Sequence, residues 1–483
     1  MSPKKPLFIS TAIPYVNAKP HLGHALEFVE TDIIARYNRL LGKEVFFLSG
    51  TDDNASKNVE IAEAAGVPIK EFVSTQAENF KKLLQDLGCE NNDFIQTGIE
   101  ERHIKGAQKL WNLCKKGDIE LRKYKGLYCV GCEEFKTDKD IVNNECPLHP
   151  GRILQEIEEE NYFFKLKNYE KELLDLIESN KLKIVPETRR NEILSFIKGG
   201  LNDLSISRSK ERVKNWGIPV PNDDTQMMYV WFDALSNYIN ALGFAENSEK
   251  FQKFWENGES IHVVGKDISR FHAVYWPAML MSAGIKTPDI ILVHGFITSG
   301  GQKMSKSIGN VIDPYDLINE YGAEAARYIL ARHVSVFEDS DLTKESIKEY
   351  YNAGLANGLG NLVSRIMKMA TVFGIKLDKY TKLNVAGPDF SFDESMNSFE
   401  INSVMNFIWT RIAYLDGYIQ VEEPFKKIKI KPEEAKNNLI FILNELRDIA
   451  ENLLPFLPNT AKNIIYLIES NKSPETPLFP RKD

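Results

Sequence analysis

The sequence predicts an α/β fold in which a parallel sheet is split by an insertion and followed by an α-helical bundle. Short apolar strand patterns alternate with amphipathic helical patterns from residue 7 to about 119, and the alternation returns between residues 261 and 293. From about residue 316 onward, the apolar period is helical. Alternating strands and helices are typical of a parallel sheet covered by helices, so the first two regions form one doubly wound sheet.

The first half of this sheet is expected in residues 1–116. Its strand patterns occupy residues 7–10, 44–49 and 94–97, and its helical patterns occupy residues 22–41, 57–65 and 69–87. Since each strand is separated from the next by helical sequence, the strands should run parallel in a Rossmann-type arrangement.

Residues 117–209 interrupt the alternation with glycines, clustered cysteines and charged runs, and are expected to form a connective insertion. The second half of the sheet then occupies residues 210–315, with strands at 261–264 and 290–293 around a helix at 268–283. A linking helical subdomain is expected at 316–352 and a helical domain at 353–483. The long helical patterns lie at 343–373, 393–420 and 433–453.

Composition places the chain among multidomain globular proteins of the cytoplasm. It has 483 residues, 43% hydrophobic and 27% charged, with no apolar run of membrane-spanning length and no signal-peptide pattern at its start. Its five cysteines are too few for a secreted disulfide framework. The net charge of −8 excludes a generally basic surface, but a local basic patch for nucleic acid remains compatible with it.

The first chemical motif is His21-Leu22-Gly23-His24, which follows the first strand and opens a helix. Unpaired N–H groups at a helix start favour an anion such as a triphosphate, and the glycine lets it approach the backbone. Imidazoles three residues apart share a helical face and can donate to phosphate oxygens. By itself the motif also fits a capped helix with surface histidines.

The second motif is Lys303-Met304-Ser305-Lys306-Ser307, which follows the turn Ser299-Gly300-Gly301. Two ammonium groups on a glycine-hinged loop can close over a pyrophosphate leaving group. A solvated basic loop is the alternative reading.

Together and in this order on a split sheet, the two motifs resemble the signatures of class I aminoacyl-tRNA synthetases. The resemblance implies ATP binding by His21, Gly23, His24, Lys303, Ser305 and Lys306. Of these, His21, His24, Lys303 and Lys306 would be catalytic, with Mg²⁺ accompanying ATP.

Finer motifs resemble the methionyl members of that class: Ala12-Ile13-Pro14-Tyr15, the run from Tyr229 to Tyr238 and the run from Val264 to Ala278. Aromatic walls suit a polarizable thioether, and a carboxylate suits a buried ammonium. Without the resemblance, these aromatics would be interpreted as core residues, because aromatic-rich helix faces usually just pack. The resemblance implies a methionine site formed by Ile13, Tyr15, Asp52, Trp231, Ala234, Leu235, Tyr238, His272 and Trp276.

One loop departs from the methionyl pattern. Where that pattern commonly reads Thr-Asp-Glu-His-Gly, this chain has Thr51-Asp52-Asp53-Asn54-Ala55. Asp52 is kept, whereas the histidine and glycine are replaced.

Cys129, Cys132, Cys146 and His149 have the paired spacing of a tetrahedral zinc knuckle. Four protein ligands leave no open position, so the expected Zn²⁺ is structural, one per chain. The methionyl enzymes resemble this chain in carrying such knuckles in the insertion. A decayed knuckle or a redox pair are the alternatives.

In the C-terminal domain, Asn361 and Arg365 lie four apart on one helical face. In the methionyl family a similar Asn-Leu-x-Ser-Arg run contacts the anticodon, and Phe425 stands where that family has a stacking tryptophan. A plain polar helix face is the alternative. The lysines at 426, 427, 429 and 431 could contact phosphates.

The expected activity is ATP-dependent formation of methionyl-adenylate, followed by transfer to initiator and elongator methionine tRNA. We expect a monomer without membrane association. Another class I synthetase, such as the cysteinyl enzyme, is the rival within the class, and a simple nucleotidyltransferase would lack the lysine motif. A non-catalytic tRNA-binding relative is the rival outside it.

Overall fold

The computed structural model describes residues 4–129, 134–136, 141–142, 144–147, 151, 153–304, 310–377, 380 and 390–483. The chain forms two compact units. The sheet unit comprises Met1–Lys19, Lys43–Lys82 and Asn91–Val293, and the helical unit comprises Pro20–Gly42, Leu83–Glu90 and His294–Asp483. Among the described helices, none combines the length and apolarity needed to cross a membrane.

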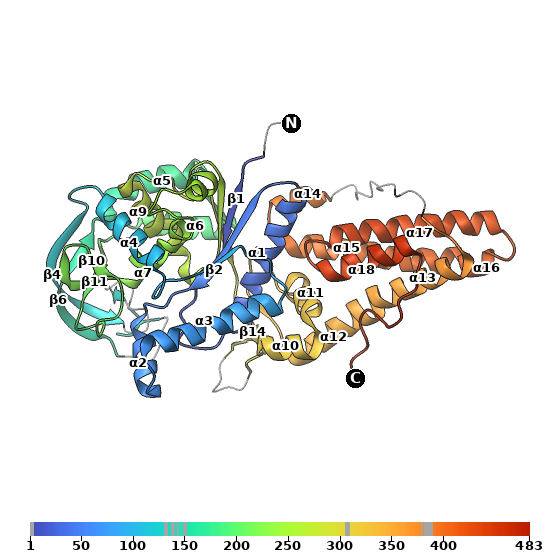
Figure 1. Cartoon of the computed structure of the whole chain (residues 1–483), viewed down its shortest axis with the longest axis horizontal. Helices are drawn as coiled ribbons and strands as arrows, with labels where there is room; N and C mark the ends of the chain where they lie inside the picture. Colours follow the sequence, from blue (N-terminus) through green and yellow to red (C-terminus); the bar gives the residue numbers. More distant parts are fainter. Residues whose placement is uncertain are drawn as a thin grey trace. The chain divides into compact units, whose positions relative to one another are not determined.

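The sheet unit is built on a six-stranded sheet with the order β3-β2-β1-β12-β13-β7, of which Figure 1 labels β1 and β2. β1 pairs in parallel with both β2 and β12, β2 with β3, and β13 with β7, which confirms the predicted parallel sheet. Strand order therefore reverses between β1 and β12, and side chains after these strands meet in the crevice where such folds bind ligands. The strands are β1 (Leu7–Ser10), β2 (Val45–Thr51), β3 (Asp93–Gln96), β7 (Lys183–Val185), β12 (Glu259–Gly265) and β13 (Ile290–His294).

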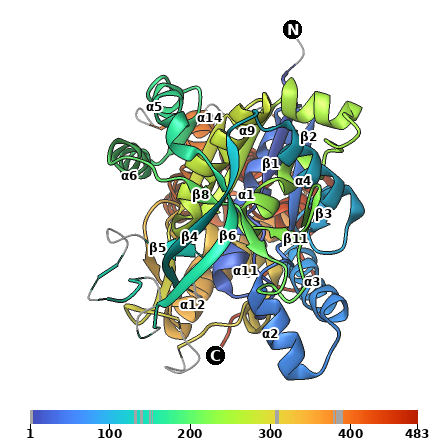
Figure 2. The same cartoon turned by 90° about the vertical axis from the view of Figure 1, so that its left-hand side faces the viewer.

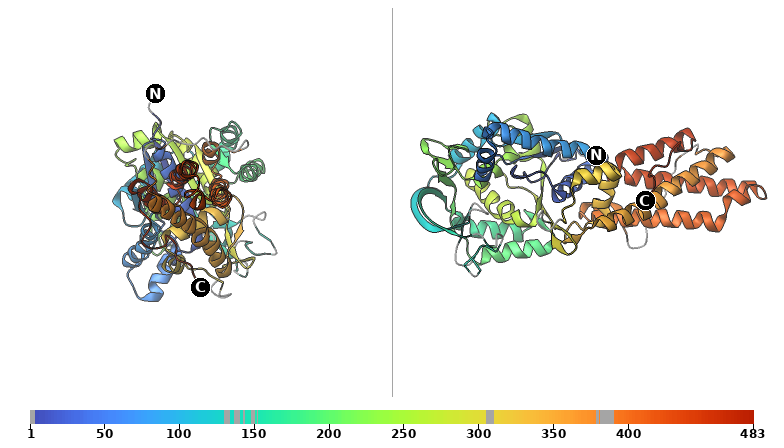
Figure 3. Two further views of the ribbon diagram at one scale, coloured as in Figure 1. Left: turned by 90° about the vertical axis from the view of Figure 1, so that its right-hand side faces the viewer. Right: turned by 90° about the horizontal axis from the view of Figure 1, so that it is seen from below.

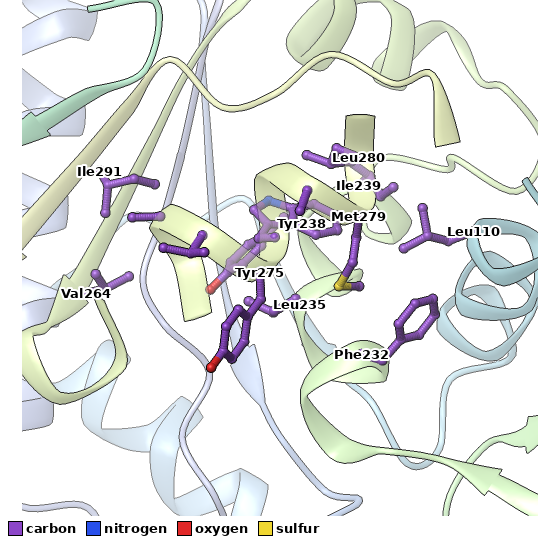
Figure 4. Close-up of a cluster of buried hydrophobic side chains, with 14 of the residues drawn as sticks. Leu110, Phe232, Leu235, Tyr238, Ile239, Val264, Tyr275, Met279, Leu280 and Ile291 are labelled. Carbon is purple, nitrogen blue, oxygen red and sulfur yellow. The ribbon is translucent and has the colours of Figure 1, made fainter. Parts of the chain in front are cut away.

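A continuous apolar core lies between the sheet and its helices. In Figure 4, Met279 lies between Ile291 on one side and Leu110 and Phe232 on the other; the four residues come from four elements, and each is completely buried. Burial on both faces explains why the central strands read as unbroken apolar runs. The helices of this unit are α2 (Ser56–Ala65), α4 (Glu101–Leu113), α7 (Val230–Leu235), α8 (Asn237–Asn240) and α9 (Trp276–Ala283), together with most of α3 (Ile69–Asp86).

The segment assigned to the insertion contains a long twisted hairpin of β4 and β6, which Figure 2 shows in teal and green. The same segment also supplies β7, the edge strand of the main sheet, which the sequence analysis did not resolve. Its elements are β4 (Ile119–Cys129), β5 (Glu134–Lys136), β6 (Gln155–Phe164), α5 (Glu170–Glu178), α6 (Glu187–Lys198) and β8 (Leu204–Ser205), and β9 (Ser207–Ser209), β10 (Pro219–Val220) and β11 (Asp223–Met228) follow.

The helical unit confirms the predicted C-terminal helices and ends in a bundle of α13, α15, α17 and α18, seen along its axis in Figure 3. A π-helical segment, Tyr351–Gly360, joins α12 to α13 without a break. The helices are α1 (Leu22–Leu40), α10 (Pro314–Tyr321), α11 (Ala323–His333), α12 (Lys344–Tyr350), α13 (Asn361–Phe373), α14 (Phe392–Asn397), α15 (Ile401–Glu422), α16 (Pro424–Lys427), α17 (Pro432–Leu453) and α18 (Pro458–Ser470). Three short strands, β14 (Ile297–Ser299), β15 (Gln302–Lys303) and β16 (Ser340–Asp341), complete it.

Arg327 of α11 connects several parts of the helical unit. Its side chain is 1% exposed and forms an ion pair of 2.8 Å with Asp32 of α1, whose side chain is completely buried. The guanidinium also donates to the backbone carbonyls of Phe456 at 2.7 Å, Pro455 at 3.1 Å and Leu87 at 3.3 Å. Because one guanidinium pairs with Asp32 and donates to three carbonyls from other segments, Arg327 stabilises the packing of α1 against α11.

Candidate active site

The two histidines that open α1 form a reciprocal cap. The backbone N–H of His21 donates to Nδ1 of His24 at 3.0 Å, and the N–H of Gly23 donates to Nδ1 of His21 at 3.1 Å. The rings stack, with centroids 3.7 Å apart. Because both Nδ1 atoms accept, Nε2 is the protonated nitrogen of each neutral ring. A Cβ at Gly23 would lie 3.0 Å from the His21 ring, so this spacing favours glycine.

A buried cluster that the sequence analysis missed lies next to His24. His294, which ends β13, contacts Glu27 of α1 at 2.9 Å. Burial, with His21 and His294 adding to it, lowers the pKa of His24 well below its ordinary value. Although burial opposes it, Glu27 and Glu30 raise the pKa of His294 to about 9. His294 is therefore charged and His24 neutral at neutral pH. The sequence offered one signal for this cluster: Glu27 lies three residues after His24 and so shares its helical face.

The lysine-rich motif begins on a small hairpin of β14 and β15, whose turn contains Gly300 and Gly301, both with positive φ. Asp341 of β16 accepts from the Gly301 N–H and from the Thr298 hydroxyl, each at 2.8 Å, and so fixes the turn. The backbone of Lys303 lies in β15. Ser305 and Lys306 lie outside the described residues.

In the sheet unit, a cavity of about 20 Å³ lies at the carboxyl ends of β1, β2 and β12. It has room for about one water molecule. Most of the residues expected to bind methionine line it: Ile13, Asp52, Trp231, Ala234, Leu235, Tyr238 and His272. Tyr15 and Trp276 stand behind this layer, with ring centroids 6.4 Å from Trp231 and 6.2 Å from Tyr238. Ala12, Asn237 and Ile268 also line the cavity; they were not singled out, although they lie within the same motifs.

His272 is held as a neutral ring. It lies in a π-helical turn, Phe271–Tyr275, which closes with the Trp276 N–H donating to the Phe271 carbonyl. Nδ1 of His272 lies 2.9 Å from the carbonyl oxygen of Ile268 and must donate to it, so Nε2 accepts from the Tyr238 hydroxyl at 2.7 Å. Burial lowers the pKa of His272 to about 4. The hydroxyl hydrogen of Tyr238 is thus directed to His272.

Asp52 gives the cavity a carboxylate. Asp52 is 2% exposed. Its backbone N–H donates to the Pro14 carbonyl at 2.9 Å, and its Oδ1 accepts from the backbone N–H of Asn54 at 3.2 Å. These bonds attach the loop after β2 to the segment after β1. A buried carboxylate among apolar walls is suited to a substrate that has one ammonium group and an apolar side chain.

Of the four expected zinc ligands, the structure describes two. Cys129 at the end of β4 and Cys146 are each 1% exposed, whereas Cys132 and His149 lie outside the described residues. The remaining cysteines, Cys89 and Cys114, behave as packing residues, and burial raises the pKa of the Cys114 thiol to about 12.

The expected anticodon residues lie on helices of the bundle. Arg365 of α13 donates to Asp416 of α15, which also accepts from Gln420 at 2.7 Å. Asn361 is exposed one turn before Arg365 on α13. On α16, Phe425 is 41% exposed, close in sequence to two other exposed apolar side chains, Val421 and Ile430.

The lysines around Phe425 are paired with carboxylates. Lys427 contacts Glu422 at 2.6 Å and Glu434 at 2.7 Å, while Lys426 contacts Glu423 at 2.5 Å. Solvent-accessible pairs of this kind are weak, so phosphate oxygens could replace the carboxylates at low cost.

Comparison with known proteins agrees with this architecture. The family model described as "tRNA synthetases class I (M)" matches residues 7–152 and 151–367. A methionine–tRNA ligase from Brucella suis biovar 1 is 38% identical over 476 residues, covering 95% of this chain and 91% of that protein. One from Fusobacterium nucleatum subsp. nucleatum is 39% identical over 479 residues, covering 95% and 74%.

A solved structure is similar over almost the whole chain. The Mycobacterium tuberculosis methionyl-tRNA synthetase in complex with methionyl-adenylate has a TM-score of 0.90 and 34% identity, covering 99% of this chain and 100% of that one. The split parallel sheet, the capped histidine pair and the helical unit are therefore those of a class I aminoacyl-tRNA synthetase. Within that class, the chain belongs to the methionyl-tRNA synthetase family.

Proposed function

We propose that the chain activates L-methionine with ATP to give methionyl-adenylate and pyrophosphate, and then transfers the methionyl group to methionine tRNA. The observation that carries this proposal is the cavity at the switch point of the sheet, with aromatic walls and the buried carboxylate of Asp52. A thioether packs well against aromatic rings, and the carboxylate is the partner for the substrate ammonium. Since a methionine side chain is larger than the cavity, the walls must move when it binds.

The activation step needs charge stabilisation more than covalent chemistry. The methionine carboxylate attacks the α-phosphorus of ATP, and pyrophosphate leaves. His21 and His24 donate from Nε2 to phosphate oxygens, Gly23 allows close approach, and Lys303, Ser305 and Lys306 hold the leaving pyrophosphate. Mg²⁺ bound with ATP supplies further positive charge. A terminal ribose hydroxyl of tRNA then attacks the adenylate carbonyl.

Exchange of labelled pyrophosphate into ATP, measured without tRNA for each of the twenty amino acids, tests the proposal. We expect exchange with methionine alone. Exchange with cysteine or another amino acid would reject the assigned pocket while keeping the class of enzyme. If no amino acid supports exchange but tRNA still binds, the non-catalytic alternative is correct.

We further propose that Cys129, Cys132, Cys146 and His149 hold one structural Zn²⁺. The described pair fits this role, because residues 119–127 of β4 are at least partly exposed whereas Cys129 and Cys146 are buried. An open hairpin that buries thiols without a large apolar core is typical of a metal-stabilised knuckle.

Elemental analysis of the purified chain should find about one zinc per chain if the four ligands form a closed site. Cys129→Ser should lower the zinc content severalfold, whereas Cys114→Ser, which changes a buried thiol elsewhere, should leave it unchanged. Equal zinc content in both variants would reject the assigned ligands.

At the other end of the chain, we propose that Asn361, Arg365 and Phe425 contact the tRNA anticodon. The support is their position: an exposed amide, a guanidinium oriented by Asp416 and a half-exposed aromatic ring on helices of one bundle. Unstacked anticodon bases are recognised by such stacking and polar groups.

Phe425→Ala should lower kcat/KM for tRNA charging about tenfold or more, because base stacking on an aromatic ring contributes about 1–3 kcal/mol. Methionine-dependent pyrophosphate exchange should stay unchanged. Tyr466→Ala removes a ring that is 54% exposed on α18 and serves as the matched control. Equal loss of exchange and charging in Phe425→Ala would contradict the assignment.

The domain bounds 1–116, 117–209, 210–315, 316–352 and 353–483 remain proposals. The cytoplasmic location and the monomeric state also stay predictions, and size-exclusion chromatography with light scattering tests the second.

A further inference from the structure

Behind the cavity, three buried polar side chains from three elements form a hydrogen-bonded chain. Asn54, in the loop after β2, donates from Nδ2 to Oδ2 of Asp233 at 2.9 Å. Oδ1 of Asp233, on α7, lies 3.0 Å from Nε2 of His103 on α4. Asp233 and His103 have no exposed surface, and Asn54 is 7% exposed. None of the three has a role in the proposed chemistry, although buried polar groups are costly unless they are well satisfied.

Asn240 determines which nitrogen of His103 carries the proton. Its Nδ2 donates to the hydroxyl oxygen of Ser236 at 2.8 Å and to the carbonyl oxygen of His103 at 3.2 Å, which assigns the orientation of the amide. The same Nδ2 faces Nδ1 of His103 at 3.2 Å. A proton on Nδ1 would face this NH₂ group, donor against donor, so Nδ1 is unprotonated and Nε2–H donates to Asp233. Asp233 thus accepts on both sides, from His103 and from Asn54, and only a carboxylate can do so.

The hydrogen-bonded side chains of Asn54, Asp233 and His103 connect two walls of the cavity. The backbone N–H of Asn54 donates to Asp52, the carboxylate assigned to the substrate ammonium. Asp233 lies on α7 between Trp231 and Ala234, which line the cavity. The side chain of Asn54 therefore attaches the loop that carries Asp52 to the helix that carries the apolar wall.

We propose that Asp233 is a positioning residue that, through Asn54, holds the Asp52 carboxylate at a fixed place against α7 and thereby sets the affinity for the substrate's ammonium group. The inference rests on the proposed amino acid site. It also gives a role to the departure from the family pattern, because Asn54 supplies the donor to Asp233 from the position where that pattern has histidine.

Two glycines pack closely against the side chains of this hydrogen-bonded network and its neighbours. A Cβ at Gly98 would lie 2.7 Å from the Cβ of Asp53 and 3.1 Å from Oδ1 of Asn54. On the opposite side, a Cβ at Gly106 would lie 1.9 Å from Oδ1 of Asn240. Both glycines make room for the network, and a larger residue at either position would displace one of its members.

Asp233→Asn is the informative substitution because it keeps the shape and replaces one acceptor oxygen by an NH₂ group. That group must face a donor, either Asn54 or His103. His103 cannot change tautomer to accommodate it, since a proton on Nδ1 would face the NH₂ group of Asn240. One of the two hydrogen bonds is therefore lost. The bond to Asn54 is the less costly one to lose, because Nδ2 of Asn54 keeps its contact with the Thr97 carbonyl at 3.3 Å, whereas Nε2–H of His103 would lose its acceptor in a buried site. Loss of the bond to Asn54 releases the loop carrying Asp52 from α7.

The readout is binding of three ligands to the full-length chain, measured by displacement of methionine. L-Methionine carries the thioether, the ammonium and the carboxylate. 3-(Methylthio)propylamine lacks the carboxylate, and 4-(methylthio)butanoate lacks the ammonium. We expect Asp233→Asn to weaken methionine and the amine about tenfold, which corresponds to about 1.4 kcal/mol. The butanoate should change less than about twofold, because it makes no contact with Asp52.

Two further variants keep the test decisive. Asn54→Ala should give the same selective loss of amine affinity while leaving the pair of Asp233 and His103 intact, and it replaces Asp233→Asn if that variant does not fold. Asp118→Asn is the matched control, since it alters a buried carboxylate that accepts from Tyr169 and Ser282, neither of which lines the cavity. It should leave the ratio of amine to butanoate affinity unchanged.

Equal weakening of the amine and the butanoate, or unchanged binding of both, would overturn the positioning role. Failure of the proposed function itself has a different signature. In that case the unsubstituted chain would show no methionine-dependent pyrophosphate exchange and would not bind methionine.

Discussion

His24→Ala is expected to slow formation of methionyl-adenylate by about 10²–10³-fold, the range found when one preorganised donor to a developing oxyanion is removed. The reciprocal cap leaves Nε2–H of His24 as a donor, and the lowered pKa keeps the ring neutral, so the loss should be similar across neutral and mildly alkaline pH. The methionine dissociation constant should change less than about twofold, since His24 acts on phosphate rather than on the amino acid.

Single-turnover kinetics of adenylate formation, together with equilibrium binding of methionine, measures both effects. Loss of the cap costs about 1 kcal/mol of helix stability, which a folded protein of this size tolerates. His24→Asn provides the control, because its amide oxygen can accept the His21 N–H while the NH₂ group replaces the lost donor. If His24→Ala instead weakens methionine binding as strongly as it slows the reaction, the assigned role is wrong.

Arg327→Met is expected to lower the free energy of unfolding of the helical unit by about 3–5 kcal/mol, the cost of removing one partner from a buried ion pair. The substitution leaves Asp32 paired with Arg36, at 2.6 Å, and removes a donor from three buried carbonyls. Methionine is close in length to the removed side chain, so the loss reports the polar contacts rather than a cavity.

The midpoint of thermal unfolding should fall by about 10 °C, given about 2–4 °C for each kcal/mol in a unit of this size. Lys171→Met is the control, since its ion pair with Asp175 is exposed and contributes about 0–1 kcal/mol. Hydrogen exchange should locate the loss in α1 and α11. A shift no larger than that of the control would show that Arg327 is not needed for the packing.

Long periodic segments were predictable from the sequence. The helix expected at 433–453 is α17 (Pro432–Leu453), and the strand expected at 7–10 is β1 (Leu7–Ser10). Such segments carry enough apolar positions for their period to be recognised. Strand β7 has only three residues, Lys183–Val185, and so carries no usable period; its place in the sheet is determined by pairing with β13.

Local backbone conformation also limited the prediction. The helix expected at 393–420 is divided into α14 and α15, and Phe399 between them has φ of +62°. A phenylalanine gives no sign in the sequence that it will adopt this conformation, which is usual for glycine.

Most of the residues expected to bind methionine line one cavity, because its walls come from motifs in which several of these residues are neighbours in sequence. The chain of Asn54, Asp233 and His103 could not be found in the same way. Asn54 and Asp233 are 179 residues apart, and no spacing rule joins them. The tertiary fold of the sheet unit brings the loop after β2 next to α7.

The π-helical turn that carries His272 makes the length of this segment as important as its composition. The turn contains one residue more than an ordinary helical turn, with the Trp276 N–H bonded to the carbonyl five residues before it. Deleting any one residue of Phe271–Tyr275 would convert it to regular α-helix and rotate the preceding residues by about 100° relative to α9. During divergence, this segment should therefore accept substitutions at its outer positions but resist single-residue insertions and deletions.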